Sequence, residues 1–223
     1  AIEQQIRLQY RKFSHGRSVF ARSSTNAEDL PNFNGAGLYT SVPNITTEDN
    51  YVSAVKVVWA SIWNFSAFEA REAAGIDHFQ VYPAVLTQVG IDADSAGVMI
   101  TTDPFRPDPL RDAVYINAKR GLGMKVVDGH KAPEQIVFHS RSNTYQVLGY
   151  TDEISQFVFD DQGGVKEILA LSGRPILDDA QVRLLARAAV QIKQLFRQQH
   201  QDIEWVMKGK KLYIVQSRPY LGR

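Results

Sequence analysis

Short β-rich segments in the middle of the chain constrain its fold more than any other feature of the sequence. They are expected to be strands, and they lie at residues 84–89, 96–101, 113–117, 135–139 and 144–148. Turn-forming clusters separate them, and the cluster at 103–109 contains three prolines, so it is expected to be extended or turning. Helical and strand patterns do not alternate regularly along the chain, as they do in a doubly wound sheet. The order of the patterns therefore predicts an α+β fold.

Helical patterns are expected at residues 3–13, 47–75 and 180–199. In the second of them, apolar side chains recur every three or four positions, which is typical of a helix packed on a core. Trp59 and Trp63 widen its apolar face and therefore predict deep packing. Either Asp178 or Asp179 can supply the N-cap of the third helix, because an Asp side chain accepts a hydrogen bond from the unpaired backbone N–H groups there.

Composition excludes several classes of protein. The 223 residues suffice for one large domain or two small ones, and 44% hydrophobic with 22% charged residues is ordinary for a globular protein. A net charge of +1 creates no broad field for nucleic acid or an anionic membrane, so neither is expected as a partner. The absence of cysteine excludes disulfides and thiolate zinc sites. Because the sequence shows no signal-peptide pattern and no bilayer-spanning run, we expect a cytoplasmic protein.

Two apolar, β-rich runs close the chain, and Lys208-Gly209-Lys210 between them indicates a hairpin turn. If these three residues form the loop, Glu204 lies opposite Ile214, and side-chain alternation places Glu204, Gln216 and Arg218 on one face. Carboxylate and amide oxygens are hard ligands that suit Mg²⁺, and a planar guanidinium suits phosphate. The hairpin therefore predicts a site for Mg²⁺ and a triphosphate. A simple cross-strand ion pair between Glu204 and Arg218 on a solvated face is the alternative.

The segment from Arg22 to Gly37 is rich in Ser, Thr, Asn, Gly and Pro and is expected to be a long loop after a buried strand at 18–21. Loops of this length inside compact domains are usually functional or disordered. Arg22 supplies a fixed cation at the strand end, and the hydroxyls and backbone amides that follow can cradle a phosphate. Gly35 and Gly37 permit close approach of the backbone to a phosphate, although a plain turn explains them equally well.

Four basic residues in the middle of the chain leave two interpretations open. Arg106, Arg111, Lys119 and Arg120 either form a basic patch for an acidic substrate or partner domain, or they belong to a solvated loop face. The second interpretation is the simpler one.

Four blocks, taken in order and spacing, resemble the ATP-binding domain of the phosphoenolpyruvate synthase and pyruvate phosphate dikinase family. The blocks are residues 22–42, 95–104, 121–123 with 126–129, and 202–219. The resemblance covers nearly the whole chain from about residue 18, and the glucan water dikinases are similar around 36–44 and 58–61. It implies an ATP-grasp-like domain with a mixed, largely antiparallel sheet and packed helices. Such a domain is a kinase that cleaves ATP to AMP and phosphate and phosphorylates a histidine on a separate domain, which relays the phosphoryl group to pyruvate or another acceptor.

By matching position, the resemblance also implies the site residues. Arg22 and Arg218 would bind the polyphosphate from opposite sides and act in catalysis, and Gly37 and Ser41 would line the phosphate loop. Glu204 and Gln216 would bind Mg²⁺, and Gln88 would line the adenine pocket. ATP and Mg²⁺ are thus the expected ligands.

The sequence departs from the family pattern at three positions. Met124 and Asn117 stand where a glutamate is usual, and Thr40 stands where an acidic residue is frequent. The three replacements leave open a dikinase for another acceptor, such as a glucan or an antibiotic, or a non-catalytic nucleotide-binding domain.

The extent of the resemblance sets the expected domain organisation. Residues 1–223 are expected to form one ATP-grasp-type fragment, with a division into 1–80 and 81–223 as the alternative. The family places an N-terminal lobe with a phosphate-binding lysine before this region, and a phosphohistidine domain and a pyruvate-binding domain after it. We therefore expect the 223 residues to be inactive alone and to have those domains as partners.

Overall fold

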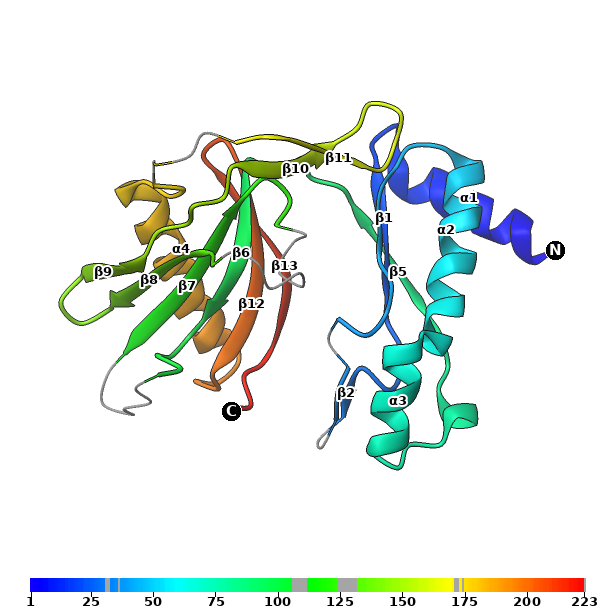
Figure 1. Ribbon diagram of the computed structural model, residues 1–223, viewed down its shortest axis with the longest axis horizontal. Helices are drawn as coiled ribbons and strands as arrows, with labels where there is room; N and C mark the ends of the chain where they lie inside the picture. Colours follow the sequence, from blue (N-terminus) through cyan, green and yellow to red (C-terminus); the bar gives the residue numbers. More distant parts are fainter. Residues whose placement is uncertain are drawn as a thin grey trace. The chain divides into compact units, whose positions relative to one another are not determined.

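The computed structural model describes residues 1–30, 33–35, 37–105, 112–123, 132–170, 173 and 175–222 (Figure 1). These residues form two compact units, which are described separately: unit 1 comprises Ala1–Ile91 with Phe159–Lys166, and unit 2 comprises Asp92–Val158 with Glu167–Arg223. Among the described residues strands outnumber helices, and the ladders of the three-stranded sheet, of the six-stranded sheet and of the short hairpin after Arg22 are antiparallel. The α+β prediction is thus confirmed.

Unit 1 is built from short helices around a small sheet. Its elements are α1 (Ile2–Ser14), β1 (Val19–Ser23), β2 (Asp29–Leu30), β3 (Phe33–Asn34), β4 (Val42–Ile45), α2 (Glu48–Ala60), η1 (Ser61–Trp63), α3 (Phe65–Ala73), η2 (His78–Gln80) and β5 (Val85–Val89). The sheet has the strand order β4-β1-β5. Val19 and Ala21 of its central strand are fully buried against Val55 and Val58 of α2. This core positions β1, which carries Arg22.

The predicted single helix at 47–75 is wrong, because the chain breaks it in two. Thr47 caps α2 as expected, and its hydroxyl accepts a hydrogen bond from the N–H of Asn50. Asn64, between η1 and α3, has an extended backbone (φ −56°, ψ 143°), so α3 starts in a new direction. The apolar period does not continue across this break, and Trp59 and Trp63 are 37% and 51% exposed. The predicted deep packing of these two side chains is therefore also wrong.

The segment after Arg22 is not a structureless loop. A short hairpin of β2 and β3 lies within it, and the N–H of Gly35 donates to the carbonyl oxygen of Glu28 at 2.7 Å. A Cβ at Gly35 would lie 3.0 Å from that oxygen, so the close backbone approach requires glycine here.

A separate two-stranded sheet is formed by β10 (Ser155–Phe159) and β11 (Val165–Leu169), which the sequence patterns did not predict. The turn between its strands is held by Asn44, a buried residue at the positive φ of 46°. The Nδ2 group of Asn44 donates to the carbonyl oxygens of Asp160 at 2.8 Å and Gly164 at 2.7 Å. Both contacts lie within unit 1.

In its described residues, unit 2 is a large sheet of six strands with one helix packed on it. Its elements are β6 (Ser95–Ile100), β7 (Ala113–Arg120), β8 (Glu134–His139), β9 (Thr144–Gly149), α4 (Asp179–Leu195), β12 (Gln201–Lys208) and β13 (Lys211–Pro219). The strand order is β13-β12-β6-β7-β8-β9. The predicted strands in the middle of the chain are confirmed as β5 to β9.

Helix α4 starts at a capping box that decides between the two predicted N-caps. Asp178 Oδ1 accepts from the N–H of Gln181 at 2.8 Å, and Gln181 Oε1 accepts from the N–H of Asp178 at 2.9 Å. The helix ends at Leu195, four residues before the predicted end at 199, and Arg197 and Gln198 then turn the chain at positive φ angles of 54° and 69°. This turn leads directly into β12.

The closing hairpin exists, but its register differs from the predicted one. Lys208 pairs with Lys211, so only Gly209 and Lys210 form the loop, and a register shift follows between Glu204 and Trp205. As a result Glu204 lies opposite Gln216, and the predicted pairing of Glu204 with Ile214 is wrong. An irregularity of this kind inserts an extra residue in one strand, here Val215.

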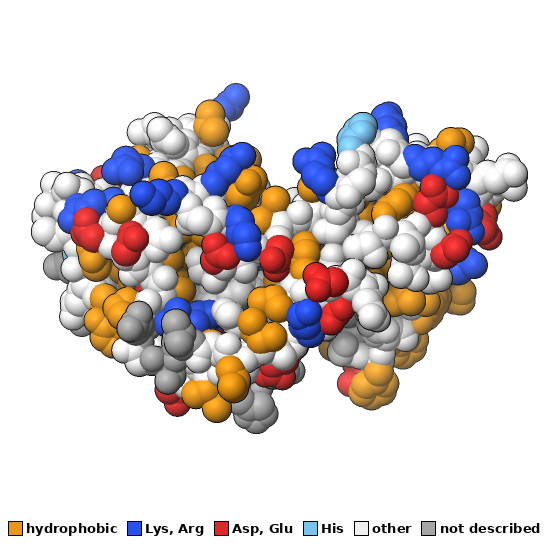
Figure 2. Space-filling view, turned by 90° about the horizontal axis from the view of Figure 1, so that it is seen from above, with side chains coloured by type: hydrophobic (Ala, Val, Ile, Leu, Met, Phe, Trp, Pro, Cys, Tyr) orange, Lys and Arg blue, Asp and Glu red, His pale blue; other side chains and the backbone are white. Residues whose placement is uncertain are grey.

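Charged side chains of both signs are interspersed over the face shown in Figure 2, in keeping with the near balance of 25 basic and 24 acidic residues. In the part of the chain that the structure describes, no helix combines the length and the apolar character that crossing a bilayer requires.

The contacts of Asp94 at the hairpin turn predict how the stability of the fold depends on pH. Asp94 accepts from the N–H of Gly209 at 2.7 Å and from Lys208 Nζ at 2.9 Å. Burial alone would raise the pKa of Asp94, but these two donors outweigh it and hold the pKa below its usual value. A carboxyl whose pKa is lower in the folded state stabilises the fold above its unfolded pKa and loses that contribution as the pH falls through the folded pKa.

We therefore expect Asp94→Asn to lower the melting temperature at neutral pH by about 2–4 °C, since a half-exposed contact is worth about 1 kcal/mol or less. The difference from the wild type should shrink below about pH 4. Thermal unfolding followed by circular dichroism across this range measures it, with Asp161→Asn as a control because the Asp161 side chain is fully exposed. An equal difference at neutral pH and at about pH 3 would contradict the assignment.

Candidate functional site

The candidate residues of unit 2 lie on the face of the large sheet that does not pack against α4. Ile203, Trp205 and Met207 of β12 are buried in the core with α4. Side chains alternate along a strand, so Asp202 and Glu204 point to the opposite face. The register of the hairpin then decides which side chains become neighbours on that face.

Two adjacent rows of side chains cross this face. The first row runs over neighbouring strands through Gln216, Glu204, Val98, Asn117 and Gln135, which are paired in register and half-buried. The second row runs through Arg218, Asp202, Ile100 and Tyr115. Directly opposed residues have Cβ atoms about 4.5–5.5 Å apart, so the side chains of Glu204 and Gln216 are within reach of one metal ion.

Arg218 is held by Asp202. Its Nε and Nη2 atoms both donate to Asp202 Oδ2, at 3.0 and 2.9 Å, and the two side chains are 25% and 19% exposed. The other carboxylate oxygen of Asp202 is buried and has no hydrogen-bond partner among the described residues. Asp202 is not among the site residues predicted from the sequence. Its position two residues before Glu204 places it on the same face of the strand and could have indicated its role.

In unit 1 the structure brings Arg22 and Gln88 together. Arg22 lies in β1 opposite Leu86 of β5, and its Nη1 atom donates to Gln88 Oε1 at 3.3 Å. Both side chains are half-buried. The positions predicted for the polyphosphate and for the adenine pocket are therefore neighbours on one small sheet.

The two remaining site residues of unit 1 are exposed. Gly37 adopts a φ of +78° with open space where a side chain would stand, so its backbone conformation favours glycine. Ser41 directly precedes β4, and the hydroxyl of its neighbour Thr40 accepts a hydrogen bond from Asn64 Nδ2 at 3.2 Å. Gly37 and Ser41 belong to unit 1 together with Arg22, whereas Glu204, Gln216 and Arg218 belong to unit 2.

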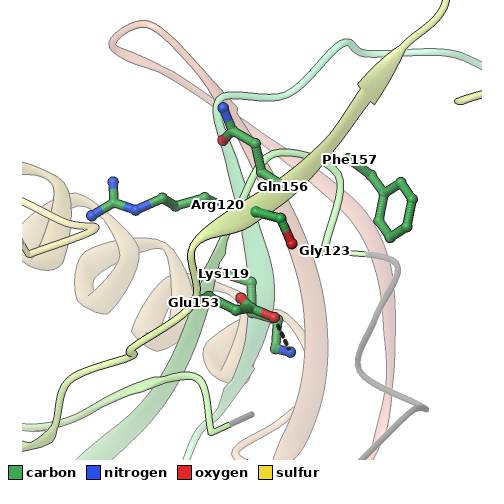
Figure 3. A pocket seen from close by; sticks show the side chains of 7 residues that line it. Lys119, Arg120, Gly123, Glu153, Gln156 and Phe157 are labelled. Carbon is green, nitrogen blue, oxygen red and sulfur yellow. Dashed lines mark hydrogen bonds and ion pairs between the residues drawn. The ribbon is translucent and has the colours of Figure 1, made fainter. Parts of the chain in front are cut away.

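A small pocket lies where β7 meets the start of β10 (Figure 3). Its lining residues are Lys119, Arg120, Gly123, Glu153, Ser155, Gln156 and Phe157. Lys119 Nζ lies 3.0 Å from Glu153 Oε1, and the two residues are only 5% and 7% exposed. The interpretation of Lys119 and Arg120 as a solvated loop face is therefore wrong, because both are residues of β7. Arg106 and Arg111 lie outside the described residues.

The first row can supply oxygen ligands to a metal ion. In the described ranges, no group of three or more His, Cys, Asp or Glu side chains is arranged to hold a metal. Glu204 and Gln216 offer a carboxylate and an amide oxygen, and the Oδ1 atom of Asn117 on the same row is buried without a hydrogen-bond partner in the described part of the chain. Such a donor set suits Mg²⁺, which takes few protein ligands and completes its shell with water and phosphate oxygens. Met124 lies outside the described residues.

Comparison with known proteins confirms the resemblance seen in the sequence. The family described as "Pyruvate phosphate dikinase, AMP/ATP-binding domain" matches residues 1–221. The phosphoenolpyruvate synthase of Pseudomonas aeruginosa is 32% identical over 237 residues, which cover 98% of this chain and 30% of the relative. That of Pyrococcus furiosus is 30% identical over 234 residues, covering 98% of this chain and 28% of the relative.

A third relative, named "Probable phosphoenolpyruvate synthase", comes from Methanocaldococcus jannaschii. It is 30% identical over 205 residues, which cover 91% of this chain and 17% of the relative. The chain thus spans less than a third of the length of these three relatives. Because the family match extends over nearly all of its residues, the chain belongs to the pyruvate phosphate dikinase AMP/ATP-binding domain family.

Proposed function

We propose that this chain is the ATP-binding portion of a phosphoenolpyruvate synthase-like phosphotransferase, with an ATP-grasp-like fold and Mg²⁺ as its metal. The proposed reaction cleaves ATP to AMP and phosphate and places the β-phosphoryl group on a histidine of a separate domain, for relay to pyruvate. One phosphate leaves to water and the other to the histidine, so both phosphoanhydride bonds are broken. The observation that carries the proposal is the direct opposition of Glu204 and Gln216, with Arg218 on the next row of the same face.

The residues of unit 2 would neutralise and orient the phosphates. Glu204 and Gln216 would hold Mg²⁺, which supplies positive charge to the phosphate oxygens when bound. Arg218 would contact the phosphates through its planar guanidinium. One carboxylate oxygen of Asp202 accepts hydrogen bonds from Nε and Nη2 of Arg218. These two bonds fix the plane of the guanidinium before the nucleotide binds.

The residues of unit 1 would bind nucleotide as well. Arg22 would contact the polyphosphate and Gln88 the adenine side, and their hydrogen bond supports a common site for the two. Gly37 and Ser41 would supply a backbone and a hydroxyl to the phosphate loop. In phosphoryl transfer the main tasks of a protein are positioning and charge stabilisation, and two arginines with a metal ion meet both.

One observation favours a second candidate function, a non-catalytic nucleotide-binding domain. Asn117 presents an uncharged amide on the row of Glu204, at a position where the family resemblance implies a glutamate. An amide can ligate Mg²⁺ but brings no negative charge, so binding could persist while the transfer step weakens.

Replacing Arg218 tests the phosphate site. We expect Arg218→Ala to weaken ATP binding about 10- to 150-fold in isothermal titration, because a hydrogen bond to a charged group is worth about 1.5–3 kcal/mol. The matched control is Arg183→Ala, which removes another Arg–Asp pair with the same 2.9 Å separation, on α4. Unchanged affinity in Arg218→Ala would sink the site assignment.

Replacing Glu204 tests the metal site. We expect Glu204→Gln to abolish most of the difference between ATP affinity with and without Mg²⁺, because the carboxylate charge that holds the ion is lost. Titrations of ATP with Mg²⁺ and with EDTA measure this difference, and Glu69→Gln on α3 serves as the control. If the variant kept the full Mg²⁺ dependence, the metal would have to be bound elsewhere.

The 223 residues alone are expected to form no AMP from ATP, because the proposed phosphoryl acceptor lies on another domain. A protein that also contains the histidine domain should form AMP, and chromatography of the nucleotides measures it. AMP formation by the 223 residues alone would contradict the first expectation. A longer protein that binds ATP and forms no AMP would favour the non-catalytic candidate.

A further inference from the structure

The ion pair between Lys119 and Glu153 is buried, although such a pair seldom stabilises a fold. Lys119 Nζ and Glu153 Oε1 are 3.0 Å apart, and their side chains are 6% and 9% exposed. The free energy needed to remove two charges from water offsets most of their attraction. A protein with an apolar pair of similar volume in their place is therefore often equally stable or more stable. A buried pair of this kind is therefore a candidate for a role in a site.

Lys119 lies on the polar face of the large sheet, which is the face that does not pack against α4. Val114, Ile116 and Ala118 of β7 are buried with α4, so the side chains of Asn117 and Lys119 point to the other face. Asn117 belongs to the row of Glu204, and Lys119 pairs with Ala96 one row further along. The ion pair thus lies on the polar face one row beyond Asn117, on the strand two places from β12.

Glu153 comes from the segment 151–157, which passes over this end of β7. The Thr151 hydroxyl accepts from the N–H of Glu153 at 3.2 Å and so orients the carboxylate-bearing residue locally. Figure 3 shows Lys119 and Glu153 pointing toward one another, whereas Arg120 and Phe157 point away from them. The ion pair is therefore a side-chain contact that ties this segment to the polar face.

The same segment holds the glycine turn that follows β7. The N–H of Leu122 donates to the carbonyl oxygen of Phe157 at 3.0 Å, and Gly121 forms a bridge with Phe157. From the other side, the N–H of Gly121 donates to the carbonyl oxygen of Asp94 at 2.9 Å. Gly121 and Gly123 both have a φ of +65°, and a Cβ on Gly123 would lie 3.0 Å from Ala96 Cβ. The turn therefore has no spare room, and its position depends on the segment 151–157.

We propose that Lys119 and Glu153 are positioning residues of the nucleotide site: their ion pair clamps the segment 151–157 over β7 and thereby holds the Gly121–Gly123 turn and the Asn117 row in place. This inference rests on the proposed function. Neither residue touches the nucleotide in this scheme, so the two act through one contact. Loss of either charge should have the same consequence.

The test is a double-mutant cycle on the full chain, with Lys119→Met, Glu153→Leu and the double variant Lys119→Met/Glu153→Leu, and with Glu153→Gln as a further single variant. Each is expected to weaken MgATP binding about tenfold or more, as loss of a positioning partner typically does. The double variant should lose no more than either single one, because the contact is shared. The apolar double variant should also keep stability near the wild type, and Lys119→Arg should recover part of the affinity.

Amide hydrogen exchange supplies a readout that does not depend on nucleotide. The Leu122 amide should exchange faster in Lys119→Met, whereas the Ile203 amide in the sheet core should not change. Lys193→Met is the matched control, since Lys193 also has a largely buried side chain and an acidic partner, Asp112, but lies on α4. It should alter neither the exchange of Leu122 nor the affinity.

Three results would overturn the inference. Wild-type affinity in Lys119→Met and Glu153→Gln would show that the pair is structural only. Weaker binding in Lys119→Met with unchanged or tighter binding in Glu153→Gln would instead show that Lys119 contacts the nucleotide directly. The third result is a wild-type chain that binds no ATP, which would overturn this inference and the proposed function together. The first result, with loss of ATP affinity confined to Arg218→Ala, would overturn this inference alone.

Discussion

The packing of α4 on one face of the large sheet is the interaction on which the rest of unit 2 depends. Leu185 and Ala189 of the helix and Ile116, Ile203 and Trp205 of the strands are almost completely buried in this contact. Side chains alternate along a strand, so when one set of residues packs against the helix, the residues between them point to the other face. A shift of one residue in any central strand would move the polar residues into the core, so the apolar pattern strongly specifies the register.

The polar face is the complement of this core. Glu204 and Gln216 meet on it because the hairpin loop contains two residues and Val215 is an extra residue in β13. On the second row Arg218 is held by Asp202, and the first row continues from Glu204 to Asn117 at the centre of the sheet. Lys119, one row beyond Asn117 on the same strand, forms a buried ion pair with Glu153. A single packing contact therefore accounts for the positions of the proposed metal ligands, the proposed phosphate ligand and the proposed clamp.

Unit 1 shows where periodicity alone misleads. The periodic apolar residues Tyr51, Val55, Val58 and Ile62 are buried, as a helical period predicts. The chain then changes direction at Asn64 and leaves Trp63 and Phe65 exposed. Nothing in the period of the apolar residues marks this break. The strand before Arg22 was predicted, but it extends to Ser23 and so includes Arg22. Its pairing with β5 brings Gln88 to Arg22. That pairing joins residues far apart in the sequence, so spacing along the chain could not show it.

The sequence by itself determined the fold class, the central strands, the N-terminal and C-terminal helices, the existence of the closing hairpin and the family to which the chain belongs. Local propensity and periodicity suffice for these features, because they depend on neighbouring residues. Only the tertiary structure decided that Glu204 faces Gln216, that Asp202 holds Arg218, and that Lys119 is buried against Glu153. Each of these depends on the register of strands or on contacts between distant segments, and a shift of one residue reverses the direction of every side chain in a strand.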